Sequence, residues 1–246
     1  MAETAREGRA LEQVPEETGE SLVSQTIDAI TRHIRDNDLG PGDRLPSESQ
    51  LSRDMGVSRT VVREAFSSLA AMRLIGLSAG RRAVVAELDH GAMSHMIRHG
   101  VDIEQISIQQ IYDVRRTIEM RTASLAALRR SEEEGRRILD HAIAMRDGLD
   151  DLPAIMEHDI AFHLEIAKAA RNPVFTLIVG AFDGVTRQTW PVGWRSRQTL
   201  AEQIAMLDLH RSLAEAIVAG EQAQASDLMA KHFDGSVKAL IMAGIA

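Results

Sequence analysis

The chain has 246 residues and a net charge of −8; 44% of its residues are hydrophobic, but only 3% are aromatic, and none is cysteine. The absence of cysteine excludes disulfides and thiolate zinc sites, and a core of Ala, Leu, Ile, Val and Met favours a mainly α fold. Because no signal peptide and no bilayer-length apolar run is present, we expect a soluble, cytoplasmic protein without membrane association.

Residues 1–19 are rich in glutamate and show little apolar periodicity, so we expect a disordered tail. From Ser21 to Arg35, apolar residues recur at spacings of three and four, which predicts an amphipathic helix. Turn-forming residues follow from Asp36 to Gly42. A short extended link is expected before Pro46, because the residue that precedes a proline avoids the helical region.

Two further helices are predicted on either side of a Met-Gly-Val turn at 55–57. Ser47 and Ser58 are suitable N-caps for them, since a serine hydroxyl accepts a hydrogen bond from a free N–H at a helix start. Arg59 and Arg63 are four residues apart, so they project from one face of the second helix. This pattern is typical of a helix-turn-helix, whose second helix presents its N-terminal residues to base edges.

The chemistry of these side chains suits DNA. An arginine at 59 or 63 can bind guanine O6 and N7 with two hydrogen bonds, and the hydroxyls of Ser58 and Thr60 suit phosphate oxygens. Two short apolar runs, 74–78 and 83–86, then flank a tip with Gly80, Arg81 and Arg82, which predicts a β-hairpin wing. Gly80 would let the backbone approach DNA closely.

The distribution of charge supports this hypothesis better than the net charge does. Residues 53–82 contain six arginines and two acids, a net of +4, whereas residues 88–246 have a net charge of −5. A local basic patch can bind DNA while an acidic body stays away from it. The alternative is that the two helix arginines are ordinary solvated residues, but the turn, the cap and the basic hairpin together disfavour it.

At this point the sequence resembles the GntR family of bacterial regulators. The similar motifs are the run from Gly40 to Glu48, Gly56-Val57-Ser58-Arg59-Thr60 and Val62-Arg63-Glu64-Ala65. The resemblance covers residues 20–87 and implies a winged helix-turn-helix that acts as a homodimer on a short palindromic operator in double-stranded DNA. At Ser49 many relatives carry an arginine or asparagine that contacts DNA, so half-site preference stays open. The implied DNA-binding residues are Arg44, Ser49, Ser58, Arg59, Thr60, Arg63, Gly80 and Arg81.

Residues 88–105 are predicted to be a linker, in which Met93, Met96 and Ile97 form a short docking helix. The pattern of residues 106–246 is helical without strand signals, with breaks at Ser131, Asp150–Pro153, Asn172-Pro173, Trp190–Gly193 and Gly220. We therefore expect an all-α antiparallel bundle for effector binding and dimerisation. Its six predicted helices lie near 107–130, 132–148, 153–171, 173–189, 197–219 and 221–244.

Four polar residues are expected inside this bundle. Asp159 and His163 share a helix face that continues through apolar residues, and His210 and His232 have mainly apolar neighbours. Buried polar groups need partners, and three imidazoles with one carboxylate suit a divalent metal: zinc first, with nickel and manganese as alternatives. Sequence spacing alone cannot make the four residues converge, so a hydrogen-bonded core or surface role is the alternative for each histidine.

The second half also resembles the FCD effector domain of the FadR subfamily. The matching residues are Tyr112-Asp113-Val114-Arg115 with Glu119, Asp159 with Phe162-His163, Asn172-Pro173, His210 and His232. In that family the matching aspartate and three histidines bind a metal, so the resemblance implies Asp159, His163, His210 and His232 as ligands. Open coordination positions would accept a carboxylate. Arg115 and Glu119 are the candidate effector-binding residues, with Arg115 as a bidentate partner of that carboxylate; a buried Arg115–Glu119 ion pair is the alternative.

These patterns predict a ligand-responsive transcriptional regulator rather than an enzyme. A small organic acid would enter the bundle and shift operator affinity, and we expect a repressor that the acid releases. One alternative is a direct metal sensor without an organic ligand, which would use the same residues. A metal-dependent hydrolase is another, but it needs a general base, and no second acid is evident beyond Glu119. Trp190, Trp194, Arg195 and Arg197 either close the pocket or pad an interface.

Overall fold

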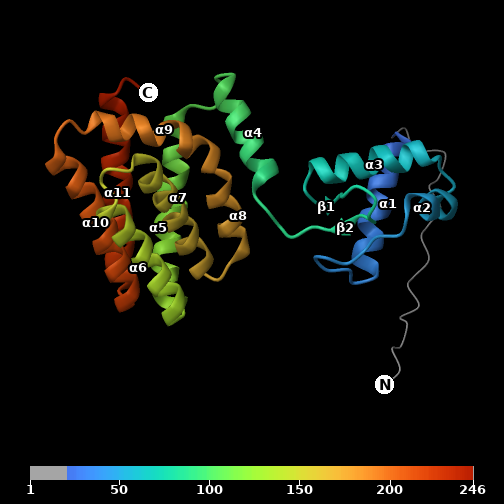
Figure 1. Cartoon of the computed structure of the whole chain (residues 1–246), viewed down its shortest axis with the longest axis horizontal. Helices are drawn as coiled ribbons and strands as arrows, with labels where there is room; N and C mark the ends of the chain where they lie inside the picture. Colours follow the sequence, from blue (N-terminus) through green and yellow to red (C-terminus); the bar gives the residue numbers. More distant parts are fainter. Residues whose placement is uncertain (1–20, 246) are drawn as a thin grey trace. The chain divides into compact units, whose positions relative to one another are not determined.

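The computed structural model describes residues 21–245, and the predicted tail lies outside them. The chain divides into two compact units, one ending at Ala92 and the other beginning at Met93. A small three-helix domain with two short strands makes up the first unit, and a bundle of longer helices makes up the second (Figure 1). Of the helices described, none has both the length and the apolar character required to span a bilayer.

The first unit is a winged helix-turn-helix, and its helices begin where the sequence predicts. Helices α1 (Leu22–Asp36), α2 (Glu48–Met55) and α3 (Arg59–Ala71) each start after a serine whose hydroxyl accepts a backbone N–H. Gly56 ends α2 with φ of 71°, a left-handed conformation that glycine adopts without strain. The three helices enclose a common core of fully or nearly fully buried apolar residues: Ile30, Leu45, Leu51, Met55, Val62, Phe66, Leu69 and Ile75.

The wing is a two-stranded antiparallel sheet that residues 42–45 extend at one edge. Strand β1 (Ile75–Gly76) pairs with β2 (Val84–Val85), with Ile75 opposite Val85. Arg44 forms a bridge with Val84, and the N–H of Leu45 donates to the carbonyl of Ala83 at 2.9 Å. The extended link before Pro46 therefore anchors the wing to the helical core.

The second unit is a bundle in which the breaks predicted at Ser131, Asn172-Pro173 and Gly220 are all present as helix ends. The longest helices, α5 and α11, pack along each other, and the core between the helices is filled by large residues such as Phe162 and Phe233. The elements are α4 (Gly91–Asp102, in this unit from Met93 onward), α5 (Ile108–Arg129), α6 (Glu132–Asp147), α7 (Leu152–Ala169), α8 (Pro173–Ala181), α9 (Asp183–Ser196), α10 (Leu200–Ala219) and α11 (Gln222–Met242).

One predicted helix, 173–189, is wrong in its boundaries. The chain turns at Phe182 instead, which separates α8 from α9, and α9 then continues through Pro191 to Ser196. Phe182 is buried beside Val185, and the turn-forming pair Asp183-Gly184 follows it directly, so packing and a local turn signal coincide here. Pro191 removes one backbone donor, but buried Trp194 holds the helix against the core beyond it.

Helix α4 occupies most of the stretch expected to be a linker. Its Ile97 and Val101 pack against a small cluster that includes Phe182 and Val185. At Gly184 on α9, an added Cβ would lie only 3.2 Å from Oγ of Ser94. The two helices therefore approach closely there, and α4 is docked on the bundle through α9.

Candidate DNA-binding surface and buried pocket

The exposed N-terminus of α3 carries four of the predicted DNA-binding residues: Ser58, Arg59, Thr60 and Arg63. Ser58 is the helix cap, and its Oγ accepts the N–H of Val61 at 3.3 Å. The guanidinium of Arg63 lies 3.4 Å from a carboxylate oxygen of Glu48. That side chain of Arg63 is 70% exposed, so water screens this ion pair and leaves Arg63 free to exchange it for a base or a phosphate.

The remaining four residues lie on the wing, on the segment beside it and on α2. Gly80 has φ of 69° at the tip, and Arg81 beside it is exposed, as is Arg44 on the bridging segment. Ser49 on α2 is only half-buried and also reaches the surface. The structure thus places all eight predicted residues on the surface of one small domain. Six of them lie on the two parts that a winged helix-turn-helix offers to DNA, its recognition helix and its wing, whereas Arg44 lies on the segment beside the wing and Ser49 on α2.

In the second unit, three helices bring the predicted histidines together. His163 on α7, His210 on α10 and His232 on α11 are all buried, and one ring nitrogen of each lies within 4.8 Å of the others. Each ring also has a buried nitrogen with no hydrogen-bond partner: Nε2 of His163, Nε2 of His210 and Nδ1 of His232. Three orphaned nitrogens in one place are costly unless a ligand satisfies them.

The hydrogen bonds of His163 and His210 indicate which of their ring nitrogens could bind a cation. Nδ1 of His163 is 2.5 Å from Oε2 of Glu119, and Nδ1 of His210 is 2.9 Å from the carbonyl oxygen of Met206. A carboxylate and a carbonyl only accept hydrogen bonds, so both Nδ1 atoms carry a proton, and the nitrogen that a cation could bind on each of these rings is Nε2. Burial lowers the pKa of His232 well below its ordinary value, and the neighbouring histidines lower it further, so this ring is neutral.

Asp159 lies at the edge of the cluster. Its Oδ1 is 2.9 Å from Nε2 of His210, close enough for an ion pair, although this nitrogen has no hydrogen-bond partner. The group whose donor atoms lie within 4.8 Å of one another consists of the three histidines, and the carboxylate of Asp159 lies beside it. Burial alone would raise the pKa of Asp159, but the contact with His210 and the other imidazoles hold it below its ordinary value. The donor set therefore fits a divalent metal.

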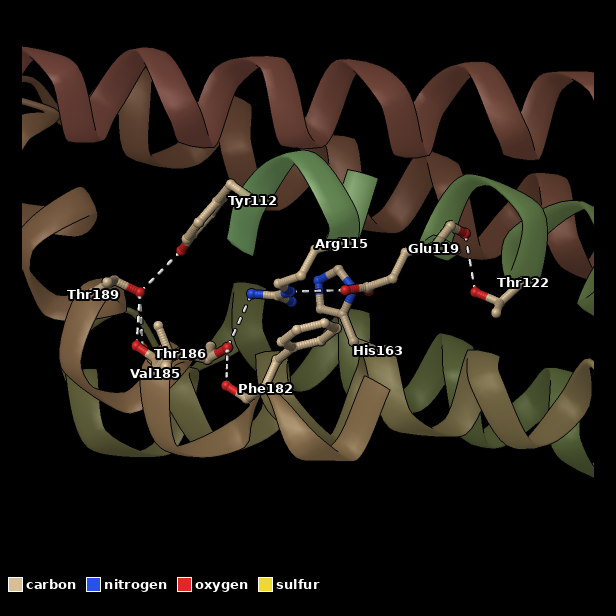
Figure 2. A network of polar contacts seen from close by, with 9 residues as sticks. All are labelled: Tyr112, Arg115, Glu119, Thr122, His163, Phe182, Val185, Thr186 and Thr189. Atoms are coloured by element: carbon tan, nitrogen blue, oxygen red, sulfur yellow. Dashed lines mark hydrogen bonds and ion pairs between the residues drawn. The ribbon is translucent and has the colours of Figure 1, made fainter. Parts of the chain in front are cut away.

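Behind the cluster, Arg115 and Glu119 form a buried ion pair on α5. Nε of Arg115 donates to Oε1 of Glu119 at 2.8 Å, and its Nη1 donates to the hydroxyl of Thr186 at 2.9 Å (Figure 2). Burial would raise the pKa of Glu119, but Arg115 and His163 lower it, so the carboxylate is charged. Of the two predicted effector-binding residues, Arg115 lines a pocket, whereas Glu119 contacts Arg115 and His163.

This pocket lies beside the metal-binding candidates, and Asp159 and His232 form part of its wall. Helix α9 supplies Trp190 and Trp194, whose rings stack at 5.2 Å with an angle of 14°. The free volume is about 30 Å³, enough for roughly two water molecules. Arg197, just after α9, also lines the pocket; sequence analysis left its role open, since helix spacing does not show where a residue beyond a helix end points.

A winged helix-turn-helix joined to a helical bundle with a buried polar pocket defines a class of protein, the ligand-responsive DNA-binding regulators. Comparisons with known protein families support this class. Residues 22–85 match the model for bacterial regulatory proteins of the gntR family, and residues 110–235 match the FCD domain. The chain therefore belongs to the GntR family and carries an FCD domain, as the sequence motifs predict. Members of this family bind DNA operators and are transcriptional regulators rather than enzymes.

Individual relatives extend over most of the chain. The HTH-type transcriptional regulator LutR of Bacillus subtilis is 30% identical over 81% of this chain and 92% of its own length. The galactonate operon transcriptional repressor of Escherichia coli is 30% identical over 70% of this chain and 79% of its own length. A GntR protein of Streptococcus agalactiae has the same fold, with a TM-score of 0.67 and 21% identity over 87% of this chain and 97% of that chain.

Proposed function

We propose that the helical unit binds a divalent metal and a small organic acid, and that the acid changes the affinity of a homodimer for a palindromic operator. The observation that carries this proposal is the convergence of three buried imidazoles with unpartnered nitrogens beside a polar pocket. A buried nitrogen without a partner destabilises the fold. Its presence on three neighbouring rings therefore indicates a binding site.

The metal ligands in this proposal are His163, His210, His232 and Asp159. Nitrogen and oxygen donors suit zinc best, with nickel and manganese as alternatives. The bound cation would supply a Lewis-acidic centre to which a carboxylate can bind. Glu119 orients the ring of His163 through Nδ1, and a carboxylate behind a ligating histidine is a common arrangement at metal sites.

The pocket favours an acid with further polar oxygens. Its lining offers hydroxyls from Tyr112, Thr186 and Thr189, together with the guanidinium of Arg115, whose charge Glu119 offsets. The relative that regulates the galactonate operon also supports an organic acid as the effector class. That relative is a repressor, and we infer the same direction here: the operator is occupied without the acid and released with it.

Acid binding requires a change in the pocket wall, because a free volume of about 30 Å³ is too small for an organic acid. The stacked Trp190 and Trp194 on α9 form part of this wall, so a movement of their rings would enlarge the pocket. Helix α9 also packs on α4 through Gly184, and α4 follows directly on the first unit in the chain. An acid that binds the open pocket better than the closed one would shift the population of α9 and α4 arrangements.

The test uses full-length protein and an operator selected from random duplexes. Metal content is measured by mass spectrometry of desalted protein, and operator affinity by fluorescence anisotropy with and without a panel of carboxylic acids. We expect about one divalent metal per chain and weaker operator binding with at least one acid. Loss of metal binding in His163→Ala, with the acid response lost as well, would support the proposal. An acid response that survives full removal of metal would refute it.

A direct metal sensor is the second candidate, and the small free volume favours it, since a metal with water fits without any movement. Titration of metal into stripped protein on operator DNA separates the two candidates. If metal alone switches operator binding strongly and no acid adds to this, the metal is the signal. If metal leaves operator binding unchanged until an acid is added, the acid is the signal.

A further inference from the structure

Arg197 is a pocket cation that the proposed metal site does not use. It follows α9 directly and is half-buried, and it lines the same pocket as Asp159, Arg115 and His232. Its Nη1 donates to the carbonyl oxygen of Gly193 at 2.6 Å. A guanidinium has five N–H donors, and in the described part of the chain this carbonyl is the acceptor that Arg197 contacts.

Among the described residues, Arg115 and Asp159 in the pocket wall each have an ion-pair partner, whereas Arg197 has none. The charge of Arg115 is offset by Glu119 at 2.8 Å, and the charge of Asp159 would be offset by the bound cation. Arg197 forms no ion pair with any residue between 21 and 245. Burial lowers the pKa of this guanidinium, and the attraction of Asp159, Tyr112 and Glu202 does not compensate. A half-buried cation without a counter-charge is costly and suits an anionic ligand.

The surroundings of Arg197 also fit an acid with a short apolar middle. Met206 and Leu240 line the pocket with the stacked tryptophans, and Ser236 adds a hydroxyl. A divalent cation with one aspartate ligand leaves a charge of about +1, and Arg197 adds another. A ligand with two negative charges would neutralise both.

We propose that the effector is a short dicarboxylate, with one carboxylate at the metal and the other bound by the guanidinium of Arg197. This inference rests on the proposed function above and narrows the class of acid. Arginine suits the second carboxylate because its planar fork can donate two parallel hydrogen bonds. The apolar side chains would then contact the methylene groups between the two carboxylates.

A purely structural role for Arg197 makes a different prediction. An arginine near a helix C-terminus can simply satisfy a free carbonyl, as Arg197 does at Gly193. In that case a change at 197 would alter stability, and it would not alter the choice between acids with one and two carboxylates. The quantity to measure is therefore the ratio of the affinity for a dicarboxylate to the affinity for the monocarboxylate of equal length.

The experiment compares acids of equal chain length by calorimetric titration of desalted, zinc-loaded protein: butanoate against succinate, and pentanoate against glutarate. We expect at least one dicarboxylate to bind about ten- to a hundredfold more tightly than its partner acid, the usual range for a hydrogen bond to a charged group. Arg197→Gln should abolish this preference, because the second carboxylate loses its cationic partner. Arg197→Lys, which keeps the charge, should retain part of it.

Arg195→Gln is the matched control, because Arg195 is exposed and does not line the pocket. It should keep the wild-type preference. If monocarboxylates and dicarboxylates bind equally, or if Arg197→Gln weakens both alike, the dicarboxylate inference is overturned while the acid-binding function stands. If neither kind of acid binds to any variant that retains zinc, both the inference and the proposed acid effector fail.

Discussion

Replacement of Glu119 by glutamine tests how His163 is oriented. In the native site Oε2 of Glu119 accepts the proton of His163 Nδ1, and Oε1 accepts a hydrogen bond from Arg115. Glutamine has the same shape, but one oxygen becomes an NH₂ group that donates. With the amide oxygen facing Arg115, the NH₂ faces Nδ1 and favours the tautomer with its proton on Nε2. That proton would occupy the nitrogen that is proposed to bind the metal.

This substitution should change two quantities, the metal affinity and the free energy of unfolding. The metal affinity should fall about 10- to 100-fold, the usual effect of losing the partner behind a ligating histidine. In metal-free protein, Arg115 would remain as a buried cation, only 5% exposed, without its counter-charge. The loss of one partner from a buried ion pair should lower the free energy of unfolding by about 3–5 kcal/mol.

The two effects can be measured independently. Zinc affinity is measured by competition with a chromogenic chelator, and the free energy of unfolding by urea denaturation of metal-free protein. Glu133→Gln is the matched control. Glu133 pairs with Arg137, but its side chain is 75% exposed, so its loss should cost under about 1 kcal/mol and should leave zinc affinity unchanged.

A second substitution tests the ion pair itself. Arg115→Met combined with Glu119→Gln removes the positive charge of Arg115, which would otherwise lack a counter-charge. The double variant should therefore be more stable than Glu119→Gln alone. Wild-type zinc affinity in Glu119→Gln would show that Glu119 does not orient His163. A double variant that is less stable than Glu119→Gln would show that the unpaired charge of Arg115 does not cause the loss of stability.

Other changes test the two units separately. Arg63→Ala should weaken specific operator binding by about 1–3 kcal/mol in fluorescence anisotropy, with unchanged metal content; unaltered affinity would mean that Arg63 does not contact bases. Ser58→Ala removes the acceptor for the N–H of Val61 and should cost about 1 kcal/mol of stability in thermal unfolding, whereas equal stability would rule out the cap. His210→Ala should lose the metal but keep its helical circular dichroism; full metal retention by mass spectrometry would show that His210 is not a ligand. Metal removal with a chelator should lower the melting temperature of the bundle but not that of the winged helix-turn-helix, and a bundle insensitive to chelation would contradict a bound structural metal.

Local signals in the sequence predicted the first unit well. Ser47 and Ser58 each cap a helix as predicted, and Gly56 takes the left-handed conformation at the turn, because these features depend on residues a few positions apart. The same holds for the breaks in the bundle at Ser131 and Gly220.

Where packing decides the structure, the sequence was less informative. The break at Phe182 is followed directly by Asp183-Gly184, a turn signal that the sequence analysis did not use, and Pro191, a strong breaker, lies inside a helix that is held by buried Trp194. The contact between Glu119 and His163 joins residues 44 positions apart on different helices. Helical spacing places each residue on the inner face of its own helix, but it cannot show which residues meet across the bundle.

Arg115 connects the two halves of the proposed site. On one side its guanidinium binds Glu119, which holds His163, and on the other it binds Thr186 in the pocket wall (Figure 2). In a regulator of this design, acid and metal affect each other's affinity by the same factor, because linkage is reciprocal. The protein would then act as a coincidence detector: a cell starved of the cation would respond poorly to the acid, even when the acid is abundant.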